Sequence, residues 1–185
     1  MKKIGFTSII LLSILLQACN DDAKNDDIAI APKDMAKLEV PMDHDDAQFA
    51  IQAVDKGMAE IEMGQLAIKN GSDKRIKNFG AMMIRDHTKA DSKLEMIAKT
   101  KKISLPATID TTEQRIISGL TKNTGKAFDK VYLNDIIRDH ENNIKLYQAA
   151  SKQLMDPDLR GYAAKNLMIF QRHLDAMNII KGSMR

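Results

Sequence analysis

Apolar residues recur at spacings of three and four through most of the chain after residue 47, and this pattern restricts the fold more than any other feature. It is typical of helices that bury one face. We therefore predict four long helices, over about residues 48–69, 73–101, 126–154 and 156–181. On the first helix, the predicted inward stripe consists of Ile51, Val54, Met58, Ile61 and Ile68.

Two short breaks set the arrangement of these helices. Asn70-Gly71 ends the first helix and leaves a very short turn, so the first two helices must be antiparallel neighbours. Asp156-Pro157 is a capping residue followed by proline, which is a typical helix start, and it opens the last helix. The sequence therefore predicts two tight helical hairpins.

The connection between the hairpins is longer. It contains a loop over about residues 103–109 and then a short helix, which begins at the capping-box pair Asp110 and Glu113. Two hairpins joined by one crossover predict an all-α fold. We expect a ferritin-like four-helix bundle over residues 47–185, with a short extra helix in the crossover.

The first residues have the form of an export signal. Lys2 and Lys3 precede an apolar run over residues 4–16, which is shorter than the roughly 20 residues that a membrane-spanning helix needs. The segment Leu16-Gln17-Ala18-Cys19 resembles the lipobox of bacterial lipoproteins, and Cys19 is the single cysteine of the chain. We predict a lipoprotein signal peptide over residues 1–18 and a lipid, such as palmitate, on Cys19; the alternative is an ordinary secretory signal.

The segment after Cys19 is acidic. Residues 20–46 carry nine acidic residues and three lysines, with two prolines and little apolar periodicity. Residues 19–46 are therefore predicted to be a solvated tether between the lipid and the bundle. Because Asn20 follows the cysteine where an inner-membrane retention signal has aspartate, we expect an outer-membrane anchor, facing the periplasm or the cell surface.

Charge and aromatic content argue against a nucleic-acid partner. The segment 47–185 carries a net charge of +7, but its lysines and arginines are spread over every predicted helix. Tryptophan is absent and aromatic residues make up 4% of the chain, which leaves no stacking platform for bases. We expect the membrane as a partner, through Cys19, and no nucleic acid; no protein partner is identified.

Three of the four histidines lie on the apolar stripes of three different helices. These are His87, His140 and His173, each near the middle of its helix, so a common layer inside the bundle is expected. Glu60 lies at the middle of the first helix, beside a stripe of glycines. Imidazoles with one carboxylate are ligands for a divalent transition metal such as zinc, copper or iron. The alternative is that each histidine is a neutral core residue with nearby partners.

Other chemistries lack their sequence signals. The residues three positions before the three histidines are Ile84, Ile137 and Phe170, so the Glu-x-x-His motifs of a di-iron centre are missing. The motifs Gly-x-Ser-x-Gly and His-Glu-x-x-His are also missing, and Cys19 is assigned to the lipid. No catalytic residue is predicted.

Several segments together resemble the domain of unknown function family 4142. They are Ala59 to Ala67, Phe79 to Ala90, Leu105-Pro106, Phe128 to Tyr132, His140 and His173-Leu174. The resemblance covers about residues 47–180. It implies a ferritin-like bundle in secreted or outer-membrane-associated bacterial proteins, without an established activity, and it marks the same four positions, Glu60, His87, His140 and His173.

Two functions follow as expectations. The first is a non-enzymatic envelope lipoprotein whose bundle serves an interaction or a stress response. The alternative is a protein that binds a metal ion or small ligand at the histidine cluster inside the bundle.

Overall fold

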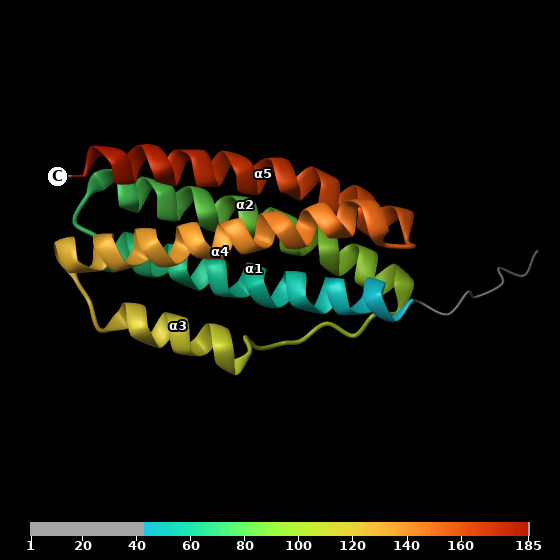
Figure 1. Cartoon of the computed structure of the whole chain (residues 1–185). Coiled ribbons are helices and arrows are strands. Elements are labelled where there is room, and N and C mark those ends of the chain that lie inside the picture. The colour runs from blue at the N-terminus through green and yellow to red at the C-terminus, as the bar shows by residue number, and fades with distance from the viewer. Residues whose placement is uncertain (1–42, 185) are drawn as a thin grey trace, which may run out of the picture. The chain divides into compact units, whose positions relative to one another are not determined.

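The computed structural model describes residues 43–184, and within them the fold is entirely helical (Figure 1). The signal peptide, Cys19 and nearly all of the predicted tether lie outside these residues. The helices are α1 (His44–Asn70), α2 (Lys74–Lys101), α3 (Thr111–Thr121), α4 (Gly125–Gln153) and α5 (Pro157–Ser183). The predicted four-helix bundle with an extra crossover helix is confirmed. None of these five helices is long and apolar enough to cross a bilayer.

The long helices form two antiparallel hairpins, α1 with α2 and α4 with α5 (Figure 1). The crossover returns along the outside of the bundle, where α3 packs on α1 and α4. As a result α2 and α4 run in the same direction, and the middles of all four long helices lie at one level. This arrangement is what brings mid-helix residues together.

The first helix begins at His44, within the last residues of the segment predicted to be the tether. Asp43 is the N-cap, whose side chain accepts a hydrogen bond from the Asp45 amide. Asp46 is only 2% exposed, because its carboxylate accepts the backbone amides of Met155 and Asp156 in the α4–α5 turn. The acidic end of the tether therefore contains a structural residue of the bundle.

A similar contact holds the hairpin turn at the opposite end of the bundle. Asp129, near the start of α4, accepts hydrogen bonds from the backbone amides of Ser72 and Asp73 and from the Ser72 hydroxyl. These donors lie in the α1–α2 turn. Each hairpin turn is thus held by an aspartate from the first helix of the other hairpin.

The inner face of α1 differs from the predicted stripe. Ile51 and Ile68 are about 40% exposed, whereas half of the twelve buried residues of α1 are alanine or glycine: Ala50, Ala53, Gly57, Ala59, Gly64 and Ala67. The reason is close helix packing: a Cβ atom added to Gly80 on α2 would lie 2.6 Å from the Gly64 carbonyl oxygen. Large aliphatic side chains cannot fit in so narrow a contact, so they lie outside it.

The core has two apolar parts, one toward each end of the bundle. One part contains Met63, Met83, Ile137 and Met177, and the other contains Val54, Leu94, Ile144 and Phe170. On every long helix, a buried polar residue lies in the sequence between these two groups: Glu60, His87, His140 and His173. A polar layer therefore divides the apolar core.

Candidate metal centre

The polar layer brings the three predicted histidines together. One ring nitrogen from each of His87, His140 and His173 lies within 4.8 Å of those of the other two. The side chains come from α2, α4 and α5 and are 3%, 0% and 0% exposed. The arrangement follows from helical periodicity, which keeps each histidine on the same face as the apolar residues three or four positions away.

His140 and His173 face each other with their proton-free nitrogens. His140 Nδ1 lies 3.1 Å from the carbonyl oxygen of Ile136, which only accepts, so the proton is on Nδ1. His173 Nε2 lies 3.0 Å from a carboxylate oxygen of Asp86, so the proton is on Nε2. The remaining nitrogens, His140 Nε2 and His173 Nδ1, are 3.3 Å apart. Two lone pairs at this distance repel unless a proton or another cation lies between them.

A shared proton is disfavoured at neutral pH. Burial lowers the pKa of His173 to about 4, although the hydrogen bond to Asp86 raises it in part. Burial also lowers the pKa of His140, and the neighbouring His87 and His173 add to this effect. Both rings are therefore neutral, and the two lone pairs remain directed at one point.

His87 completes the set. Its Nδ1 lies 2.9 Å from Glu60 Oε2, and burial lowers its pKa to about 4. Its Nε2 is buried without a hydrogen-bond partner. Glu60 Oε2, despite the short distance, is likewise buried without a hydrogen-bond partner. In the tautomer that carries its proton on Nδ1, beside Glu60, Nε2 has a lone pair that no protein group satisfies. A buried polar atom without a partner is costly, and a bound cation would satisfy it.

One of these distances, between His140 and His173, matches a tetrahedral metal ion. Zinc–nitrogen bonds of about 2.0–2.1 Å place two tetrahedral ligands about 3.3 Å apart. The separation of His140 Nε2 and His173 Nδ1 is 3.3 Å. His140 and His173 also each give the other ring nitrogen to an oxygen atom, of Ile136 or Asp86, which is the usual outer shell of a metal-bound histidine. His87 Nδ1 lies 2.9 Å from Glu60 Oε2, without a hydrogen bond.

Aromatic rings surround the cluster. Phe170 packs against His87 and His140, with ring centroids 5.5 and 5.4 Å apart, and Phe79 packs edge-on against His173 at 5.8 Å. These rings keep water away and fix the imidazole planes. Three neutral nitrogens held rigidly in an apolar shell suit a metal better than a catalytic proton transfer.

Glu60 lies on the α1 side of the cluster. Burial raises its pKa well above the ordinary value, and the nearby Asp139 raises it further. Asn143 donates to Glu60 Oε1 at 3.1 Å and to Asp139 Oδ2 at 3.0 Å. Burial and the neighbouring acid thus both favour the protonated form of Glu60.

Sequence reasoning missed the groups around the cluster. Asp86 and Asp139 directly follow Arg85 and Arg138 in the sequence, and this order predicts pairing at the surface with these arginines or a neighbour. Asp86 does accept from Arg85, but it also orients His173, and hydrogen bonds from both outweigh the effect of burial and lower its pKa. Asp139 pairs with Lys56, not with Arg138. Lys56 lies one turn before Glu60 on α1. This spacing was the sequence feature that could have placed Lys56 beside the cluster.

Asp91, one turn after His87, is also buried, at 8% exposure. Burial raises its pKa to about 7. It fits only because residue 57 is glycine: a Cβ atom there would lie in contact with the Asp91 carboxylate. The glycine stripe beside Glu60 thus makes room for a second acid near the cluster.

The fold and the polar layer define a class: a ferritin-like helical bundle whose interior holds imidazole and carboxylate groups without the di-iron motif. The model of the family described as a domain of unknown function, DUF4142, matches residues 31–179. The chain belongs to the DUF4142 family.

One solved structure is similar in fold, the crystal structure of a DUF305 fragment from Deinococcus radiodurans. The TM-score is 0.69 with 10% sequence identity, and the match covers 78% of this chain and 99% of that one. At this identity the likeness concerns the fold alone. No curated protein matches the chain significantly.

Proposed function

We propose that this protein binds a divalent transition-metal ion at His87, His140 and His173, and that this is the function of its bundle. The observation that supports the proposal best is the pair of ring nitrogens, His140 Nε2 and His173 Nδ1, which are 3.3 Å apart while an oxygen beside the other nitrogen of each ring favours the proton there. A cation converts this repulsion into two bonds. The unpartnered His87 Nε2 supplies a third.

The donor set selects the kind of metal. Three neutral imidazoles suit zinc, copper, nickel or cobalt and are poor ligands for magnesium or calcium, which prefer oxygen. Three ligands also leave one tetrahedral position for water or for a small ligand. The buried carboxyl of Glu60 would compensate the charge of the ion once its proton has left.

Metal stoichiometry tests the proposal. The soluble domain, residues 43–185, is expected to bind one zinc or cobalt ion per chain, and His140→Gln should abolish binding because it removes a ligand from the centre of the set. Isothermal titration calorimetry gives the stoichiometry, and circular dichroism checks that the variant is folded. His44→Gln is the matched control, because His44 is fully exposed on α1. A wild-type domain that binds no metal refutes the proposal.

The same titration reports on Glu60. Binding should release about one proton, seen as a dependence of the measured heat on the ionisation enthalpy of the buffer. Glu60→Gln should lose this release and weaken binding by about 10–100-fold, the usual effect of removing an outer-shell partner.

We also propose an envelope address, as a lipoprotein held in the outer membrane by lipid on Cys19. Its support is the lipobox-like segment Leu16-Gln17-Ala18-Cys19 behind a charged and apolar start. In this setting the bundle would bind metal outside the cytoplasm, and the stress role expected from the sequence would be protection from, or storage of, that metal.

Cys19→Ser is expected to abolish incorporation of labelled palmitate and to leave the signal peptide over residues 1–18 uncleaved, because cleavage follows lipid attachment. Lipid attachment needs the thiol, and more than one acyl chain is needed for stable anchoring. Asn20→Ala should retain the label. Palmitate label that persists in Cys19→Ser, or a wild-type protein that takes up no label, would overturn this address.

A further inference from the structure

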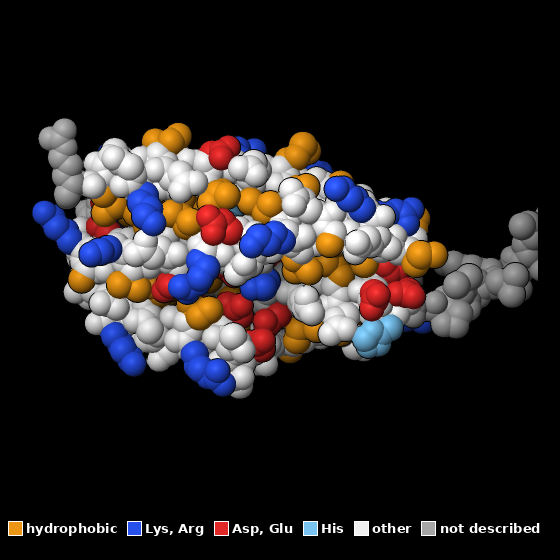
Figure 2. Space-filling view, in the orientation of Figure 1, with side chains coloured by type: hydrophobic (Ala, Val, Ile, Leu, Met, Phe, Trp, Pro, Cys, Tyr) orange, Lys and Arg blue, Asp and Glu red, His pale blue; other side chains and the backbone are white. Residues whose placement is uncertain are grey.

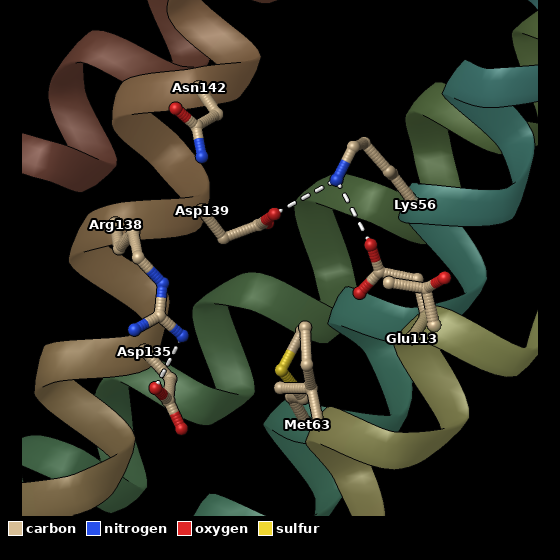
Figure 3. Close-up of a pocket in the computed structure, with 9 residues that line it drawn as sticks. Lys56, Met63, Glu113, Asp135, Arg138, Asp139 and Asn142 are labelled. Carbon is tan, nitrogen blue, oxygen red and sulfur yellow. Dashed lines mark hydrogen bonds and ion pairs between the residues drawn. The ribbon is translucent and has the colours of Figure 1, made fainter.

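A pocket lies on the face of the bundle where α3 approaches α1 and α4 (Figure 3). Its volume is about 220 Å³, and its polar lining includes Lys56, Glu113, Asp135, Arg138, Asp139 and Asn142. Figure 2 shows acidic side chains gathered where α3 meets the bundle, while lysines and arginines are scattered over the rest of this face. We call this feature the Lys56 pocket.

A continuous series of polar contacts leads from the Lys56 pocket to the histidines. Lys56 Nζ lies 3.0 Å from Glu113 Oε1 and 2.9 Å from Asp139 Oδ1 (Figure 3). Oxygens of Asp139 and Glu60 and a ring nitrogen of His140 lie within 4.8 Å of one another. His140 therefore belongs both to this acidic group and to the three-histidine group.

The charges of the pocket favour a cation. Burial lowers the pKa of Lys56, but Asp139 and Glu113 outweigh this and raise it above its ordinary value, so Lys56 is charged. One ammonium faces two carboxylates, and the other acid of the pocket, Asp135, is paired with Arg138. The Lys56 ammonium thus lies between the carboxylates of Glu113 and Asp139, which are suited to bind another cation in its place.

On the opposite side of the histidine cluster, the outer groups are positively charged. Asp86, which orients His173, is covered by two guanidinium groups, Arg85 at 2.9 Å and Arg172 at 3.3 Å. These groups would repel an approaching metal ion, and their movement would also release His173. Entry from the Asp86 side is disfavoured on both counts.

We propose that the Lys56 pocket is the entry port for the metal ion, where Glu113 and Asp139 take up the hydrated cation in exchange for Lys56 and pass it to Glu60 and the histidines. This inference rests on the proposed function. It assigns to Lys56, Glu113 and Asp139 a role in the rate of uptake, distinct from that of the histidines in affinity.

The test is stopped-flow uptake of Co²⁺ by the soluble domain, followed by the visible absorption of tetrahedral cobalt. Glu113→Gln and Asp139→Asn should each slow uptake about tenfold, in the range of electrostatic effects on association. Asp135→Asn is the matched control, because it removes a carboxylate from the same pocket but not from the series of contacts. Its uptake rate should stay within about twofold of wild type, the scale expected for a paired surface charge.

The outcomes separate the two proposals. If the wild-type protein gives no cobalt spectrum, the metal function fails and the port fails with it. If the spectrum forms but Glu113→Gln takes up cobalt at the wild-type rate, the port is wrong and the metal function stands. Equal slowing in Asp135→Asn would also overturn the port, because it would indicate a general effect of charge.

Discussion

Zinc is expected to raise the melting temperature of the metal-free domain by about 12 °C. A ligand that binds only the folded state stabilises by about 4 kcal/mol when its free concentration is a thousand times its dissociation constant. For a domain of this size, 1 kcal/mol corresponds to about 3 °C. Differential scanning calorimetry with and without zinc measures the shift. The physical reason is that the ion relieves the repulsion between His140 and His173 and satisfies the orphaned His87 nitrogen.

His87→Gln and His173→Gln should remove nearly all of this shift, while His44→Gln should keep it and magnesium should not produce it in any variant. A shift that survives in either cluster variant would place the metal elsewhere in the chain.

The dependence of the shift on pH is a second readout. Because the pKa of His87 and of His173 is lowered to about 4, protons do not compete for these rings above about pH 5. Only the proton of Glu60 must leave, so affinity should rise by at most about tenfold per pH unit. Exposed histidines, with ordinary pKa values near 6.5, would instead give a steep loss of affinity just below pH 6.5. A steep loss there would contradict the buried, neutral cluster.

Asp129→Ala is expected to destabilise the bundle by about 3 kcal/mol, because it removes a charged acceptor from two backbone amides and one hydroxyl. The melting temperature should fall by about 10 °C. Urea unfolding gives the free energy directly. Asp175→Ala, on the exposed surface of α5, should stay within about 0.5 kcal/mol of wild type.

Asp46 allows a stricter version of this experiment. Its contacts with Met155 and Asp156 lie in the other hairpin turn, so the effects of Asp46→Ala and Asp129→Ala should add within about 0.5 kcal/mol. A much smaller double effect would mean that the two ends do not unfold in one cooperative transition.

The helices and the level of the histidines could be predicted because both depend on local rules. Apolar spacing and the breaks at Asn70-Gly71 and Asp156-Pro157 define the hairpins, and a fixed rise per residue then places mid-helix residues side by side. The three histidines and Glu60 consequently meet where the sequence predicted.

Other features depended on neighbours distant in the chain. The buried face of α1 includes Gly64, which packs directly against Gly80 on α2, whereas Ile51 and Ile68 are partly exposed although apolar spacing favours them. The start of α1 is likewise fixed by the distant turn that Asp46 holds.

The sequence by itself thus determined the helices, their antiparallel order and the residues of the polar layer, since these follow from periodicity along one chain. Only the tertiary structure decided which nitrogen of each imidazole is free, which acid stands behind it, and that Lys56 meets Glu113 and Asp139. Proton positions and ion pairs depend on atoms a few ångströms apart, which belong to helices far apart in the chain.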